Sequence, residues 1–180
     1  KKLKNSIYSF QYNDFEALSK LVKEKNIDVI KMEVIRNQQP QHNFLEKVRD
    51  LANKYKIILI FDECTSGFRE TFGGIYMKYN IIPDIAIYGK AMGNGYAITA
   101  VVGKGDIMQE EKNTFISSTY WTERTGYAAG IETINQFQKL NVIEYLIDIG
   151  EYFDCKIKNL IDTIGINITM GGLVTIPSMI

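Results

Sequence analysis

The feature that most constrains the fold is a pair of short apolar runs, each of which ends in polar side chains. Ile57–Phe61 runs into Asp62, and Ile85–Tyr88 runs through a glycine into Lys90. Runs of four or five β-branched and aromatic residues between charges, Gly and Pro are typical of buried strands in a parallel sheet. The carboxyl ends of such strands open into a crevice where ligands bind. We therefore expect a carboxylate and an amine, 28 positions apart (90 − 62), at the tips of neighbouring strands.

The remaining chain alternates strand-like and helical patterns, which predicts an α/β fold: a mostly parallel sheet with flanking helices. A strand, a helix and a strand joined by short links form a right-handed βαβ unit. The other predicted strands are Ile27–Ile35, Ala97–Val102, Phe115–Ser118 and a strand pattern over Asn167–Pro177. One predicted helix begins after a cap at Asn13 or Asp14. Others cover Phe44–Tyr55, a short stretch Ile75–Tyr79 and Thr125–Leu140, and one long amphipathic helix runs from Ile143 to Ile164.

Composition excludes several function classes. The 21 basic and 21 acidic side chains balance, and there is no basic tract that would attract nucleic acid or an anionic membrane. No apolar run approaches the length of a membrane span, and no signal-peptide pattern opens the chain. Cys64 and Cys155 are isolated, without metal-ligand spacing, so we expect no metal site and a reducing cytoplasm.

A lysine and an acid at neighbouring strand tips suit one cofactor in particular. A lysine that forms a Schiff base must lose its proton near neutral pH, and a carboxylate can hold the protonated nitrogen of a pyridine ring. Pyridoxal 5'-phosphate (PLP) needs both groups. Taken singly, however, a strand-end Asp is usually a loop cap and a lone Lys is usually a solvated surface group.

Two stretches together resemble the class III (fold type I) PLP-dependent aminotransferases. Residues 61–68 read FDECTSGF, and residues 83–103 read PDIAIYGKAMGNGYAITAVVG. Within that class the chain is most similar to the glutamate-1-semialdehyde 2,1-aminomutase-like branch, because GFR follows the acid. The resemblance implies an enzyme that uses PLP. Its reaction would move an amino group between an amine or amino acid and a carbonyl compound through a Schiff base on lysine.

The resemblance also implies roles for single residues. Lys90 matches the Schiff-base lysine, and Asp62 matches the partner of the ring nitrogen. Cys64 stands where the family usually has a valine against one ring face, and Thr65 stands near the ring hydroxyl. Glu33 matches the acid of the family's Glu-Pro motif, although a valine replaces the proline.

Further along, SSTYWTERTGYAAG resembles the family segment that opens a helix at the dimer interface. There the resemblance implies a homodimer in which Thr119 reaches the partner subunit's cofactor phosphate. Glu123–Thr125 replaces the family's Gly-Asn-Pro, so the role of Trp121–Thr125 and the choice of substrate stay open. In the plainer interpretation Thr119 is a turn residue and Trp121 an interface aromatic.

Family members are much longer than this chain, which therefore resembles a central fragment of the enzyme. By that resemblance, residues 1–140 belong to the large PLP-binding domain, residues 141–164 form the connecting helix, and residues 165–180 begin the small C-terminal domain. We expect such a fragment to bind PLP weakly, or not at all, on its own.

Two other functions compete with this interpretation. Ile57–Glu63 has the pattern of a Walker B strand, which would hold Mg²⁺ in an ATPase. An ATPase also needs GxxxxGK[ST] upstream, and both Gly-Lys pairs of this chain lie downstream without a following Ser or Thr. A non-catalytic interaction domain with the PLP fold is the second alternative, although it gives no reason to retain both Asp62 and Lys90.

Overall fold

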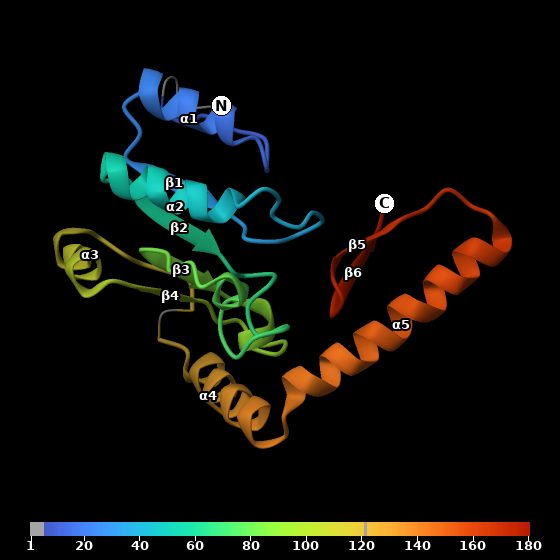
Figure 1. Cartoon of the computed structure of the whole chain (residues 1–180). Helices are drawn as coiled ribbons and strands as arrows, with labels where there is room; N and C mark the ends of the chain where they lie inside the picture. The colour runs from blue at the N-terminus through green and yellow to red at the C-terminus, as the bar shows by residue number, and fades with distance from the viewer. Residues whose placement is uncertain (1–5, 121) are drawn as a thin grey trace.

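The computed structural model describes residues 6–120 and 122–180 and has a four-stranded sheet at its centre (Figure 1). The strands lie in the order β1 (Val29–Met32), β2 (Ile58–Asp62), β3 (Ile85–Tyr88) and β4 (Ala100–Gly103). The first three are parallel, and β4 is antiparallel to β3. The α/β fold with a mostly parallel sheet that the sequence predicts is confirmed.

Two helices cover one face of β1 and β2. α1 (Phe15–Glu24) begins at Asp14, whose side chain accepts a hydrogen bond from the Ala17 N–H at 2.9 Å, and α2 (Phe44–Tyr55) follows β1. Their apolar stripes and alternate strand residues form one core, which includes Leu18, Val22, Ile30, Met32, Phe44, Leu45, Val48, Leu59 and Phe61. Because strand side chains alternate, Lys31 and Asp62 lie on the other face, which this chain leaves more open.

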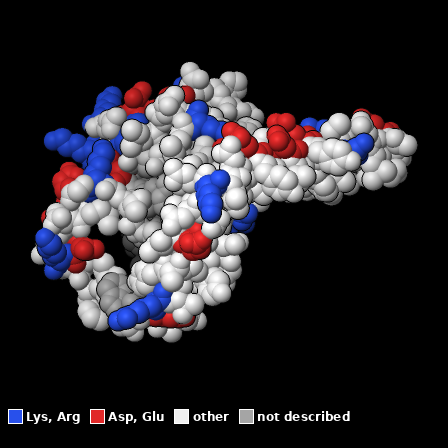
Figure 2. Space-filling model, turned by 90° about the horizontal axis from the view of Figure 1, so that it is seen from below, with Lys and Arg blue, Asp and Glu red and all other residues white. Residues whose placement is uncertain are grey.

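Short helical turns follow the strands: η1 (Ile75–Tyr79), η2 (Lys90–Met92), α3 (Gly105–Met108) and η3 (Gln109–Asn113). After these come α4 (Arg124–Lys139) and the 23-residue α5 (Val142–Ile164), which projects from the body as a single rod (Figures 1 and 2). Basic and acidic side chains are intermixed on the face shown in Figure 2. None of the helices within the described ranges is long and apolar enough to cross a membrane.

The chain ends in a hairpin of β5 (Met170–Leu173) and β6 (Ile176–Met179). Leu173 is 2% exposed and belongs to the same core as α1 and α2. The hairpin therefore packs on the sheet domain, although α5, which precedes it, projects away from that domain. It also packs on α5, where Gly150 leaves room for the Val174 carbonyl. A side chain at position 150 would collide with that backbone.

Some predicted boundaries are wrong. No strand forms at Phe115–Ser118: Phe115 is 94% exposed, and within the described ranges no neighbouring strand pairs with this segment. The single strand pattern over Asn167–Pro177 is a two-stranded hairpin, because the chain turns between β5 and β6. Apolar alternation signals an extended segment but does not specify what pairs with it.

Asp84, just before β3, joins three elements through one buried carboxylate. It accepts hydrogen bonds from the Leu59 N–H at 2.8 Å and from Arg49 at 2.9 Å, and it forms an ion pair with Lys104 at 2.6 Å. Burial alone would raise the pKa of Asp84, but these partners outweigh it and hold that pKa below its usual value. The network fixes the start of the strand that carries Lys90.

Replacing Asp84 with asparagine should lower the free energy of unfolding at pH 7 by about 2–4 kcal/mol, because Arg49 would lose its buried counterion. Since the folded-state pKa of Asp84 is lowered, its contribution is complete above the unfolded pKa of about 4 and is lost as the pH falls further. Urea unfolding at several pH values measures both effects. The exposed Asp148→Asn is the matched control. An unchanged midpoint in Asp84→Asn would contradict the role of this network.

Candidate active site

The β2–β3 pairing brings Asp62 and Lys90 to one edge of the sheet. Asp62 is the last residue of β2 and pairs in register with Ile87, three positions before Lys90. The next N–H along β2, that of Glu63, donates to the Ile87 carbonyl at 2.8 Å and continues the ladder. Because the two strands are parallel and adjacent, both functional groups leave the sheet at its carboxyl edge.

Asp62 is held by two donors. Its Oδ2 accepts a hydrogen bond from the Lys31 ammonium at 2.7 Å, and its Oδ1 accepts one from the Cys64 N–H at 3.2 Å. Burial alone would raise the pKa of Asp62, but the hydrogen bonds from Lys31 and Cys64 outweigh it, so the pKa is lowered. The side chain is therefore a carboxylate at neutral pH.

Lys90 occupies an unusual backbone conformation at the strand end. Its φ is +44°, in the left-handed region that non-glycine residues rarely adopt, and it starts the turn η2. Such a residue persists only where its surroundings enforce it, and these outliers cluster at functional sites. Its ammonium donates a hydrogen bond to the Thr65 hydroxyl at 2.7 Å. The side chain forms no ion pair with any described residue.

Cys64 lies beside both ends of this arrangement. Its backbone N–H binds Asp62, and its thiol lies within electrostatic reach of Lys31 and Lys90. Burial, followed by the contact with Asp62, raises the pKa of the Cys64 thiol. The thiol is therefore neutral at pH 7, and Cys64 acts as a small, largely apolar side chain at the site.

Glu63 faces the opposite side of the strand from Asp62. It is fully buried, and its carboxylate accepts hydrogen bonds from the Ser66 hydroxyl at 2.5 Å and the Tyr76 N–H at 3.1 Å. Burial raises the pKa of Glu63 above its usual value. These bonds hold the loop after β2 in place. A Walker B glutamate would face a catalytic water, so the position of Glu63 counts against the ATPase alternative.

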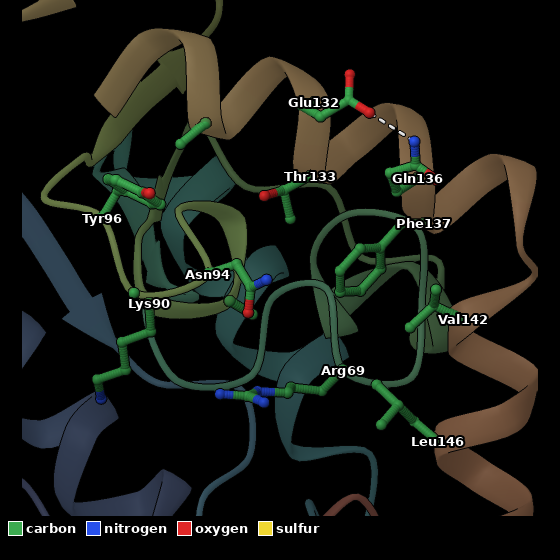
Figure 3. A pocket seen from close by; sticks show the side chains of 13 residues that line it. Arg69, Lys90, Asn94, Tyr96, Glu132, Thr133, Gln136, Phe137, Val142 and Leu146 are labelled. Atoms are coloured by element: carbon green, nitrogen blue, oxygen red, sulfur yellow. Dashed lines mark hydrogen bonds between the residues drawn. The ribbon is translucent and has the colours of Figure 1, made fainter. Parts of the chain in front are cut away.

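Lys90 also lies between two cavities. The first, of about 790 Å³, is lined by Lys90, Arg69 and residues of α4 and the start of α5 (Figure 3). In Figure 3 the Lys90 ammonium points away from α4. The second cavity, of about 730 Å³, lies along β4 and the segment before α4, and includes Lys90, Thr99, Ser118 and Tyr120. Lys90 is the residue that the two cavities share with the predicted site, and Asp62, Cys64 and Thr65 line neither of them.

The structure brings together four of the six residues predicted for the site: Asp62, Cys64, Thr65 and Lys90. Glu33 lies just beyond β1, where Arg36 binds it at 3.2 Å, and neither Asp62 nor Lys90 bonds to it. Thr119 is exposed in a turn before α4 and lines neither cavity. Trp121, in the segment whose role the sequence left open, lies outside the described residues.

Lys31 is the member of this cluster that the sequence analysis missed. It interrupts an otherwise apolar strand between the buried Ile30 and Met32. A charged residue inside a strand whose neighbours are buried must face the other side of the sheet. Asp62 lies on that side, at the end of the adjacent strand β2. A lysine between apolar strand residues could therefore have indicated a partner for the Asp62 carboxylate.

Comparisons with known proteins identify the family. The family model for class III aminotransferases matches residues 6–168. The chain is 36% identical to the 3-aminobutyryl-CoA aminotransferase of Cloacimonas acidaminovorans over 98% of its length, and 33% identical to the glutamate-1-semialdehyde 2,1-aminomutase of Methanobrevibacter smithii over 92%. It spans 45% and 41% of those two proteins.

Solved structures match over a similar extent. The ornithine aminotransferase of Plasmodium yoelii superposes with a TM-score of 0.79 at 28% identity, covering 91% of this chain and 46% of that one. The PLP form of the FumI protein from Sphingopyxis sp. MTA144 superposes with a TM-score of 0.89 at 23% identity, covering 96% and 44%, and that likeness concerns the fold. The resemblance recognised in the sequence is confirmed: the chain belongs to the class III aminotransferases.

Proposed function

We propose that the protein of this chain is a PLP-dependent aminotransferase or aminomutase. It moves an amino group between an amine or amino acid and a carbonyl compound. The observation that carries the proposal is the parallel β2–β3 pairing, which brings Asp62 and Lys90 to the same carboxyl edge of the sheet. Family membership and the relatives' names, which include both an aminotransferase and aminomutases, support the same reaction class.

The side chains present fit PLP. The cofactor needs an amine for its aldehyde and an anion for its ring nitrogen, and Lys90 and Asp62 provide these from neighbouring strands. Among the described residues the Lys90 ammonium donates to the neutral Thr65 hydroxyl and forms no ion pair, so none of them has to be displaced as a counterion. Asp62 accepts two hydrogen bonds, and a carboxylate has about four lone-pair sites, which leaves it able to accept another.

The roles of the residues follow from their chemistry. When bound, PLP supplies an electron sink that stabilises a carbanion. Lys90 would bind the cofactor aldehyde, and its free amine would carry a proton to and from the substrate α-carbon. Asp62 holds the proton of the ring nitrogen. Cys64 limits the space at the ring face, and Thr65 keeps the Lys90 ammonium at the site.

Borohydride trapping tests this proposal. The full natural polypeptide that contains this chain is incubated with PLP and reduced with borohydride. It is then digested, and the peptides are sequenced by mass spectrometry. A visible absorbance band that reduction removes, with the label on Lys90, is the expected result. Neither an ATPase nor a non-catalytic interaction domain predicts that band. Label on another lysine, or none, would overturn the assignment.

We further infer a homodimer in which Thr119 contacts the cofactor phosphate of the partner subunit. Thr119 is exposed and, within the described ranges, makes no hydrogen bond, so its hydroxyl can reach another chain. Hydroxyl and backbone N–H donors beside a helix start suit an anion, and α4 begins five positions later (124 − 119). We also assign Glu33 to the surroundings of the cofactor, because it lies within electrostatic reach of Lys31.

Thr119→Ala should weaken PLP binding by about tenfold, because it removes one neutral hydrogen-bond donor to a charged phosphate. Absorbance titration with PLP measures the change, and sedimentation velocity follows the dimer. The neighbouring exposed Thr122→Ala is the matched control. Equal PLP affinity in both variants would reduce Thr119 to a turn residue.

The remaining proposals concern organisation. Residues 1–140 are assigned to the large cofactor domain, 141–164 to the connecting helix and 165–180 to the start of a small domain. The single helix α5 and its projection from the sheet support the boundary near residue 141, whereas Leu173 of the last segment packs in the core of the sheet domain (Figure 1). The free thiols of Cys64 and Cys155 support a reducing, cytoplasmic location.

A further inference from the structure

Lys31 is a charged residue inside the otherwise apolar strand β1. Lys31 pairs in register with Ile60, so Asp62 lies two residues further along β2 on the same face of the sheet. Diagonal neighbours of this kind are within reach of a long side chain. The Lys31 ammonium reaches the Asp62 carboxylate at 2.7 Å, which is the short distance of a charge-assisted hydrogen bond.

Asp62 is surrounded by groups of both signs. Lys31 contacts Asp62 from β1. Along the chain Asp62 is followed by Glu63, which is ionisable but fully buried, and by Cys64. Lys90, in the turn after β3, lies within electrostatic reach of Cys64, and Glu33 lies within electrostatic reach of Lys31. Lys31 is the only cation among the described residues that touches the Asp62 carboxylate. A ligand at Asp62 would therefore meet an ammonium beside the carboxylate.

A cation at this place has a definite consequence for a bound pyridine ring. The carboxylate favours a protonated ring nitrogen, whereas a neighbouring ammonium opposes a second positive charge. With both present, the negative charge of Asp62 is shared between Lys31 and the ring. The ring nitrogen then holds its proton less firmly than it would against Asp62 alone.

We propose that Lys31 is a positioning residue that fixes the orientation of the Asp62 carboxylate and weakens the hold of the PLP ring nitrogen on its proton. The inference rests on the proposed function. The plainer alternative is an exposed ion pair without consequence, since the Lys31 side chain is 54% exposed and such pairs contribute little to stability. The two differ in what they predict for protonation rather than for folding.

The first test needs no cofactor. The carboxyl carbon of Asp62 is followed by ¹³C NMR against pH in the wild type and in Lys31→Met, which keeps the chain length but removes the charge. The titration midpoint should move upward in Lys31→Met and return in Lys31→Arg. Lys20→Met, which removes an exposed lysine paired with Glu24 on α1, is the control and should leave the midpoint unchanged. An unmoved midpoint in Lys31→Met would overturn the inference.

The second test follows the PLP-loaded protein with ¹⁵N in the cofactor ring. The ring-nitrogen chemical shift should change from the protonated to the neutral value at higher pH in Lys31→Met than in the wild type, and Lys31→Arg should restore the wild-type profile. Identical profiles would overturn the role toward PLP. Both proteins are prepared within the full natural polypeptide, and a full-length wild type that takes up no PLP would overturn the proposed function and this second role together, while the carboxyl titration would still decide the first. Circular dichroism confirms that each variant is folded.

Discussion

Replacing Lys90 with alanine is expected to reduce turnover by about 10⁴-fold or more, because the change removes both the amine that binds the cofactor and the proton carrier. Lys31 is another amine in this cluster, and it is bound to Asp62 and cannot substitute. The fold should survive, since the Lys90 side chain is exposed and its hydrogen bond is to the Thr65 hydroxyl. Steady-state transamination with a panel of amino donors measures the loss.

Two further variants make the Lys90 result specific. Lys90→Arg keeps the positive charge and the bulk but cannot form the covalent link, so it should be as inactive as the alanine variant. Lys112→Ala removes an exposed lysine from η3 and should keep full activity. Turnover within tenfold of wild type in Lys90→Ala would mean that another group carries the chemistry.

Asp62→Asn should lower kcat by about 10²–10³-fold while PLP remains bound, because a neutral amide accepts a hydrogen bond but does not stabilise positive charge on the ring nitrogen. Lys31 would also lose its counterion, which adds repulsion at the same place. Substrate binding depends on other residues, so KM should change less than kcat.

The wild-type pH profile gives an independent check on Asp62. Because hydrogen bonds hold the pKa of Asp62 below its usual value, the acid limb of activity that belongs to this group should lie below about pH 4. Asp106→Asn, an exposed residue of α3, is the control for the substitution itself. A near-normal rate in Asp62→Asn would show that a different acid holds the ring nitrogen.

The sequence predicted the central part of the fold because that part depends on local patterns. The apolar runs at Ile57–Phe61 and Ile85–Tyr88 match β2 and β3 closely, and the stripe of Phe44–Tyr55 matches α2. Strands buried on a sheet and helices with one apolar stripe leave a direct trace in composition. Asp62 and Lys90 were found together because each directly follows, or nearly follows, such a run.

What the sequence did not predict depends on contacts between distant segments. Lys31 and Asp62 are 31 positions apart, and only the register of β1 on β2 brings them together. The same holds for the failed strand at Phe115–Ser118, which has apolar residues but no partner within the described ranges. The hairpin of β5 and β6 depends equally on a turn that a run of strand-like residues does not reveal.

The left-handed backbone at Lys90 has a consequence for how this position is maintained. Glycine adopts φ +44° readily, whereas any residue with a Cβ is strained there by about 1–3 kcal/mol. Stability alone would thus favour glycine at this position. Under the proposed function the amine of Lys90 outweighs that strain, so an inactive descendant of this protein should lose the lysine before it loses the sheet.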